Sequence, residues 1–205
     1  MTWYKCGITA ISVFIVSLLF HGCAAAPSRF YILNALERSE TPRACRDERT
    51  VTIGINPVDL PRYLNRPQIM TRATDNELML SEHNLWAEPL KEALPRVIAQ
   101  NLSSLLCADV LIFPWSGPEQ VDYRLTAEVI RLDCRPGGDA LLEMQWSVMD
   151  EHARKVLISR ESRFTEQVSV HDYPAFVRAY SSLLASLSRE MADAFKSVTR
   201  AGQNQ

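Results

Sequence analysis

Apolar residues recur at helical spacing between residues 86 and 106, and this stripe constrains the fold more than any other feature of the sequence. A stripe of that width must be buried against a sheet or against another helix. Pro89 is compatible with the first turn of such a helix, whereas Pro95 would remove a helical hydrogen bond. We therefore expect a kink at Pro95 or a helix that begins later than the stripe. The stripe consists of Trp86, Leu90, Leu94, Val97, Ile98, Leu102, Leu105 and Leu106.

Segments that alternate apolar and polar residues lie on both sides of this helix and predict strands. Gln68–Arg72 and Glu77–Ser81 flank a Thr-Asp-Asn turn and predict a hairpin. A three-strand meander and a second amphipathic helix, which opens near Asp172, complete the chain. Strands and helices are therefore segregated, which predicts an α+β fold: a two-layer domain with a mixed, mainly antiparallel sheet packed by two main helices. The other predicted strands are Arg29–Leu33, Thr50–Val58, Val110–Phe113, Asp122–Asp133, Ala140–Met149 and Lys155–Phe164.

Two of these strands carry further information. The alternation in Asp122–Asp133 changes phase at Ile130, which indicates either a bulge or a strand buried on both faces. Val51–Ile55, the first helix and Val110–Phe113 have the order of a parallel βαβ crossover, which would be right-handed.

The first residues are typical of an export signal. Lys5 precedes the apolar run Ile8–Phe20, which is too short to span a bilayer comfortably. Cys23 closes this run, as does the lipid-bearing Cys of a bacterial lipobox. We therefore expect a lipoprotein signal peptide over residues 1–22, a tether over 23–28 with Cys23 acylated, and one folded domain over 29–200. The alternative is an ordinary signal peptide cut near Ala24. Because residue 24 is not Asp, we expect the anchor in the outer membrane, on its periplasmic face.

Besides the lipid-bearing Cys23, three cysteines remain after such processing: Cys45, Cys107 and Cys134. An odd number in an exported chain is best explained by one disulfide and one thiol. In the expected strand arrangement all three approach one end of the sheet. We predict a Cys45–Cys134 disulfide, although the other pairings stay open, and zinc is disfavoured without a C-x-x-C motif.

Charge and motifs argue against several classes of function. Lys and Arg total 22 against 24 Asp and Glu, so no basic excess draws the chain to nucleic acid. The sequence contains no G-x-S-x-G elbow, no S-x-x-K motif and no Gly-rich phosphate loop. We therefore predict a protein that is not an enzyme and has no metal or cofactor. An exported envelope hydrolase and a lipoprotein that holds a small apolar ligand are the alternatives.

The loop from Pro57 to Pro67 is a candidate interface. Leu60, Tyr63 and Leu64 lie among prolines, and a rigid apolar loop of this kind suits contact with a partner protein or a second copy of the chain. The alternative is that these side chains only cap the edge of the sheet. We take Leu60, Tyr63, Leu64, Arg66 and Pro67 as the candidate partner-binding residues.

Two motifs in this region resemble a known family. Residues 63–69 read Y-L-N-R-P-Q-I and residues 86–90 read W-A-E-P-L. Their order and spacing are similar to the signature of the ABC-type transport auxiliary lipoproteins, the PqiC-like family, and the similarity covers nearly all of the mature chain. Asn65 replaces the usual acidic residue, and Leu85 replaces the usual Arg.

The resemblance implies an outer-membrane lipoprotein subunit of an intermembrane system that transports lipids or other hydrophobic molecules and supports membrane integrity. Its implied partner is a periplasmic MCE-domain protein, which the lipoprotein would dock to the outer membrane. A homo-oligomer is compatible with the same role.

Overall fold

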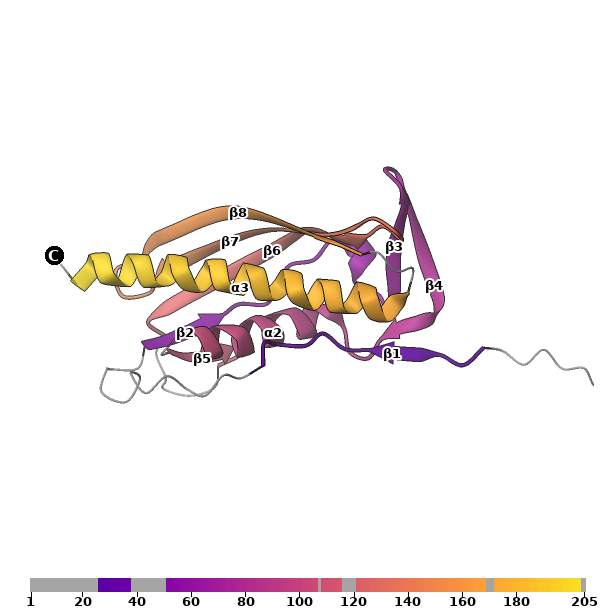
Figure 1. Cartoon of the computed structure of the whole chain (residues 1–205). Coiled ribbons are helices and arrows are strands. Elements are labelled where there is room, and N and C mark those ends of the chain that lie inside the picture. The colour runs from indigo at the N-terminus through magenta and orange to yellow at the C-terminus, as the bar shows by residue number, and fades with distance from the viewer. Residues whose placement is uncertain (1–25, 38–50, 107, 116–120, 169–171, 204–205) are drawn as a thin grey trace, which may run out of the picture.

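The structure is a computed structural model that describes residues 26–37, 51–106, 108–115, 121–168 and 172–203 (Figure 1). Within these ranges the strands form two sheets, one with three strands in the order β1-β4-β3 and one with five in the order β5-β2-β6-β7-β8. The elements are β1 (Arg29–Tyr31), β2 (Val51–Ile55), the 3-10 helix η2 (Arg62–Leu64), β3 (Gln68–Thr74), β4 (Glu77–Trp86), α2 (Leu90–Leu105), β5 (Ala108–Ile112), β6 (Tyr123–Cys134), β7 (Asp139–Asp150), β8 (Lys155–Gln167) and α3 (Tyr173–Gln203).

The five-stranded sheet confirms the predicted α+β class. Strands β6, β7 and β8 form an antiparallel meander, while β2 runs parallel to both β5 and β6. The chain passes from β2 through the hairpin and α2 to β5, as the crossover prediction requires. Both helices lie along one side of this sheet, and α3 runs nearly the whole length of the molecule (Figure 1).

The core lies between this sheet and the two helices. Alternate residues of β6 and β7 are buried, and the predicted stripe of α3 is buried with them. Asp172 caps α3, because its side-chain Oδ1 accepts a hydrogen bond of 2.7 Å from the Ala175 N–H. No helix among the described residues has both the length and the apolar character needed to cross a bilayer.

The phase change in β6 is a bulge. The β6–β7 register shifts between Val129 and Arg131, and Ile130 between them is 42% exposed. Beyond the bulge Leu132, Asp133 and Cys134 are all buried. The bulge therefore brings a charged residue into the interior at the end of the strand.

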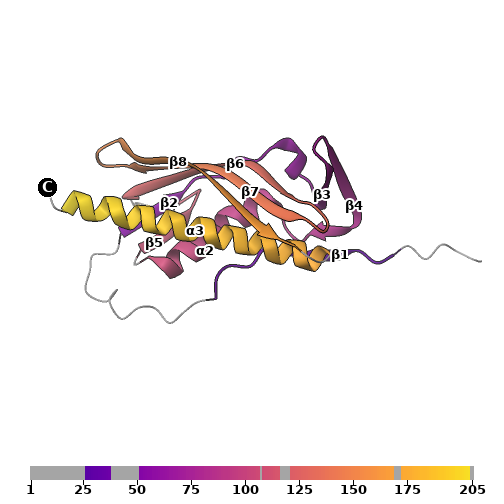
Figure 2. The same cartoon turned by 45° about the horizontal axis from the view of Figure 1, so that its top comes forward.

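The hairpin of β3 and β4 is longer than predicted, and Trp86 belongs to its second strand instead of the following helix. Helix α2 begins at Leu90, after Pro89, and continues through Pro95. Pro95 has no N–H, so the Lys91 carbonyl, four residues earlier, lacks its usual helical hydrogen bond. Lys91 is an exposed residue of the first turn. Figure 2 shows the hairpin across one end of the main sheet, close to the start of α3.

Candidate functional site

The candidate interface loop is partly used by the fold itself. Leu64 is buried, and Leu60 and Tyr63 are half-buried and packed against the core. Arg66 and Pro67 are exposed. The aliphatic residues of the loop therefore cap the sheet, and the part that a partner can reach is its polar end. Partner binding by this loop stays a prediction.

A buried carboxylate lies next to the loop and joins the two sheets. Asp133, at the end of β6, is 3% exposed. Its Oδ2 accepts hydrogen bonds of 2.8 Å from Arg72 Nε on β3 and of 2.7 Å from Arg131 Nε on β6. Burial raises the pKa of the nearby Tyr63 phenol, and the Asp133 charge acts in the same direction. We call Asp133, Arg72 and Arg131 the carboxylate junction.

The carboxylate junction is suited to holding the sheets together and not to acid–base catalysis. Burial alone would raise the pKa of the Asp133 carboxyl, but hydrogen bonds and charge from Arg131 and Arg72 lower it below its usual value. An ionised carboxylate held by two guanidinium groups is a poor proton donor at neutral pH. The sequence did not reveal this cluster, because its two arginines belong to strands of different sheets.

The tip of the hairpin has a second connection to the main sheet. Arg135, which follows β6, forms an ion pair with Asp75 in the β3–β4 turn, and Arg72 Nη1 donates a hydrogen bond of 2.7 Å to the Asp75 carbonyl. The Asp75 side chain is 88% exposed. Water screens such a pair, so the buried Asp133 contacts contribute more to holding the hairpin.

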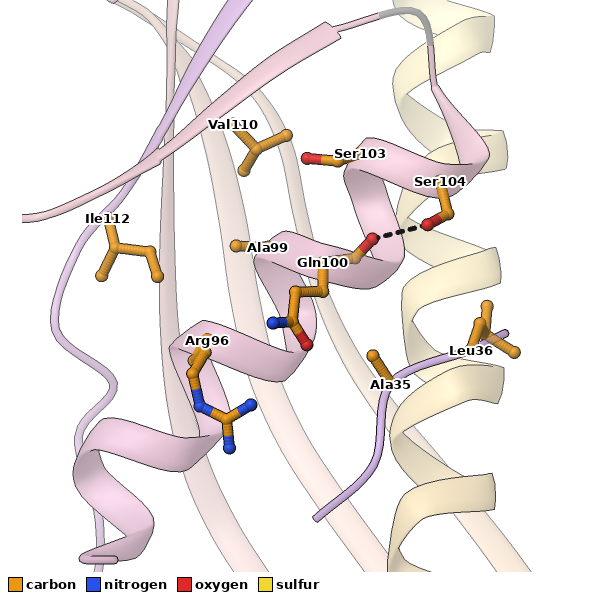
Figure 3. A pocket seen from close by; sticks show the side chains of 9 residues that line it. All are labelled: Ala35, Leu36, Arg96, Ala99, Gln100, Ser103, Ser104, Val110 and Ile112. Atoms are coloured by element: carbon orange, nitrogen blue, oxygen red, sulfur yellow. Dashed lines mark hydrogen bonds between the residues drawn. The ribbon is translucent and has the colours of Figure 1, made fainter. Parts of the chain in front are cut away.

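An open groove of about 460 Å³ lies between α2, β5 and the segment that follows β1 (Figure 3). Arg96 in this groove is paired with Glu88, and the Ser104 hydroxyl donates to the Gln100 carbonyl at 2.9 Å. The hydroxyl is therefore engaged by its own helix, and no base among the residues that the structure describes accepts its proton. The groove is lined by Ala35, Leu36, Arg96, Ala99, Gln100, Ser103, Ser104, Val110 and Ile112.

A second pocket bears on the apolar-ligand alternative. It lies where the hairpin meets α2 and α3, between Leu64, Trp86, Leu90 and Tyr180, and has a volume of about 10 Å³. This is about the space of one water-sized probe, so the pocket cannot hold a lipid chain. The structure gives the apolar-ligand alternative no support at this place.

Cysteine and metal chemistry are limited in the described part of the chain. Cys134 is a free, fully buried thiol, and burial raises its pKa to about 12. The predicted Cys45–Cys134 disulfide is thus not seen at Cys134, and Cys23, Cys45 and Cys107 lie outside the described residues. Within the described ranges no three His, Cys, Asp or Glu side chains come together as metal ligands.

Comparison with protein families gives one match over most of the chain. The model of the family described as "ABC-type transport auxiliary lipoprotein component" matches residues 31–192. The chain is 23% identical over 185 residues to the "Intermembrane transport lipoprotein PqiC" of Escherichia coli (strain K12), with 87% of this chain and 95% of that protein covered. The protein of the same name from Shigella flexneri gives the same values.

Solved structures share the fold. The crystal structure of protein XCC0632 from Xanthomonas campestris is similar with a TM-score of 0.67 and 18% identity, over 87% of this chain and 99% of that one. The crystal structure of an uncharacterized protein gives a TM-score of 0.68 and 20% identity, over 83% of this chain and 99% of that one. Identities this low support the arrangement of helices and strands and carry no functional assignment.

Proposed function

The chain belongs to the ABC-type transport auxiliary lipoprotein family, and from this premise we propose that it is the outer-membrane lipoprotein subunit of an intermembrane transport system. The observation that carries the proposal is the family match over residues 31–192, which takes in β2 to β8, α2 and most of α3. The printed name of the relatives, an intermembrane transport lipoprotein, agrees with it.

In this proposal residues 1–22 are removed and Cys23 carries the lipid. Residues 23–28 tether the domain, which extends from residue 29 to about residue 200, to the periplasmic face of the outer membrane. The lipid anchor buries several acyl chains, each methylene contributing about 0.8 kcal/mol, so the attachment is stable.

The domain acts by docking and not by carrying cargo or by catalysis. Its partner is a periplasmic MCE-domain protein, which it holds at the outer membrane so that lipids or other hydrophobic molecules pass between the membranes. Loss of this link weakens the membrane. The pocket beside Trp86 is too small for a lipid, and the groove of about 460 Å³ beside α2 is an open depression and not an enclosed cavity. The charged groups of the carboxylate junction are paired with one another. These features support a docking role.

The anchor is tested by labelling with a radioactive or clickable fatty acid and by membrane fractionation. We expect the wild-type chain to take up the label and to sediment with the outer membrane. Cys23→Ser should take up no label and should leave an unprocessed or soluble protein. A Cys23→Ser chain that fractionates as the wild type does would refute the lipoprotein assignment.

Docking is tested by capture of the MCE-domain protein with the acylated chain. Arg66→Ala changes an exposed side chain of the loop, so we expect weaker capture at an unchanged melting temperature. Leu64→Ala changes a buried side chain, so we expect a lower melting temperature first. Arg189→Ala, an exposed residue on α3, serves as the control. Normal capture by Arg66→Ala would remove the loop from the interface, and capture of a second copy instead would indicate a homo-oligomer.

A further inference from the structure

Two strands form the edges of the five-stranded sheet among the residues that the structure describes, and these edges differ in chemistry. Strand β8 carries Lys155, Arg160 and Arg163, and its pairing with β7 is irregular near the turn. Charges and irregular pairing are common means by which a sheet prevents another strand from joining it. Strand β5, at the other edge, reads A-D-V-L-I, and Asp109 is its one charged residue. The β5 edge therefore lacks this protection.

The backbone of β5 presents hydrogen-bonding groups along its outer side, where no other described strand pairs with it. The Phe113 N–H donates a hydrogen bond of 2.9 Å to the Ile55 carbonyl of β2. Successive residues of a strand direct their N–H and C=O groups to opposite sides, so Leu111 also faces β2, whereas Val110 and Ile112 face the free edge. Donors and acceptors spaced in this way match the backbone of an extended polypeptide.

The groove beside this edge provides space for the side chains of such a polypeptide. Val110 and Ile112 form its β5 wall, and Ala99 and Ser103 of α2 point toward them (Figure 3). Ile112 is 38% exposed although its side chain is aliphatic. Every second side chain of an added strand would lie over this wall, because side chains alternate between the two faces of a sheet. The volume of about 460 Å³ is within the range of ligand-binding pockets.

An aromatic cluster flanks the same edge on the other face of the sheet. Phe113 is 51% exposed, and its ring meets the Trp115 ring edge to face, with 5.4 Å between the ring centroids. Trp115 lies against Gly54 of β2, and the Arg124 guanidinium is 5.9 Å from the centroid of the Trp115 ring. Ile112 and Phe113 point to opposite faces, and a strand added to the edge would contact both. Aromatic and arginine side chains in such a place are typical of an interface.

Two occupants that lie close at hand fit this site poorly. Residues 38–50 of this chain begin two residues after Leu36, which lines the groove, but they are rich in charge and contain no Val, Leu, Ile, Met or aromatic residue. A second copy would offer its own β5, whose Val110 side chain already packs against the core of its own domain and cannot fill the groove. The occupant that fits is an extended segment of another protein with aliphatic residues at alternate positions.

We propose that β5 is an addition site for an extended segment of the transport partner, which enlarges the five-stranded sheet by one strand and places alternate aliphatic side chains in the groove. This inference rests on the docking role proposed above and names the contact by which the partner is held. The paired backbone groups provide affinity, and the groove selects the side chains.

Hydrogen exchange at single residues, followed by NMR, tests the backbone pairing directly. The sample is the processed, acylated chain in detergent micelles, with and without the purified periplasmic region of the MCE-domain protein. In the free chain the Leu111 and Phe113 amides should exchange slowly, because they face β2, whereas the Val110 and Ile112 amides should exchange quickly. The partner should slow exchange at Val110 and Ile112 by about ten-fold or more, since each amide gains a hydrogen bond.

A matched pair of substitutions tests the groove wall. Ile112→Lys places a charge at the free edge, so the dissociation constant for the partner should rise by about ten-fold or more. Val156→Lys is the control, because Val156 is an exposed aliphatic residue on β8, the other edge strand, and this variant should bind as the wild type does. Both side chains are exposed, so both melting temperatures should stay close to that of the wild type.

The results separate the inference from the proposed function. A partner that binds without slowing exchange at Val110 and Ile112, or that binds folded Ile112→Lys normally, overturns the addition site and keeps the docking role. A partner that does not bind the wild type overturns both. Slow exchange at Val110 and Ile112 in the free chain also overturns the inference, and the sedimentation mass then distinguishes a second copy from residues of the same chain. If Ile112→Lys does not fold, the exchange result on the wild type decides.

Discussion

Removing the charge of Asp133 should destabilise the domain more than any change at its surface. The Asp133 and Arg72 side chains are 4% and 13% exposed, so Asp133→Asn leaves the Arg72 guanidinium without a carboxylate in a place that water hardly reaches. Removing one partner of a buried ion pair costs about 3–5 kcal/mol. We expect the lower end of this range, because the Arg131 side chain is 33% exposed and can turn toward water.

Thermal unfolding followed by circular dichroism measures this effect. A loss of about 3 kcal/mol lowers the melting temperature by roughly 6–12 °C in a chain of this size. Asp75→Asn is the control, since it removes the exposed pair with Arg135 in the same hairpin and should leave the melting temperature unchanged. Equal melting temperatures for Asp133→Asn and Asp75→Asn would refute the structural role of the carboxylate junction.

The pH dependence provides an independent check. The folded pKa of Asp133 lies below its unfolded value, so its contribution is complete above the unfolded pKa of about 3.9 and is lost as pH falls through the folded pKa. The stability difference between the wild type and Asp133→Asn should be constant from neutral pH down to mildly acidic pH and should shrink below pH 4. A difference that disappears near neutral pH would contradict this assignment. Hydrogen exchange should locate the loss in β3 and β4, where Arg72 lies.

Three further predictions concern other parts of the domain. Leu187→Ala should lower the free energy of unfolding by about 2–5 kcal/mol, because the Leu187 side chain is fully buried, whereas Arg189→Ala should lower it little. Equal losses would mean that the buried face of α3 is misassigned. Burial raises the Cys134 pKa to about 12, so its thiol should resist iodoacetamide at pH 8 in the folded protein. After unfolding it should react without reductant. If the reaction needs reductant, the predicted disulfide at Cys134 would be supported again. Gly54→Ala should lower stability by about 1–3 kcal/mol, since the new methyl group would lie 2.9 Å from both the Trp115 ring and a Val121 methyl group. An unchanged melting temperature would show that both side chains move aside.

Strands and helices with strong periodicity could be predicted from the sequence. The meander and α3 each carry a single repeating pattern over many residues, so local preference and packing agree. The phase change at Ile130 left two possibilities, a bulge or a strand buried on both faces, and the β6–β7 register decides for the bulge, in which one extra residue shifts every later side chain to the other face. Trp86 was misassigned because its position fits both a helical stripe and the end of a strand, and only the pairing of β4 with β1 and β3 decides between them.

The carboxylate junction was beyond the reach of pattern reasoning. Asp133 looks like an ordinary polar residue before a turn, and nothing local indicates that Arg72, 61 residues earlier, will lie against it. Leu64 illustrates the same limit, because an apolar residue among prolines has the same sequence pattern whether it caps its own sheet or meets a partner. Contacts between separate sheets depend on how the sheets dock, and no short window of sequence contains that information.

The parallel pairing of β1 with β4 has a mechanical consequence. The two strands are paired in order, from Arg29 with Asn84 to Tyr31 with Trp86. This order follows the direction in which the chain enters the domain. Tension on the N-terminal side therefore loads these bonds together, in shear, and does not open them one after another. Just beyond them the Leu36 N–H donates a hydrogen bond of 2.7 Å to Asn101 Oδ1, which fastens the same segment to α2. Tension applied to β1 from its N-terminal side is therefore resisted by the domain as a single block, and the β1–β4 bonds would have to break together before the sheet came apart.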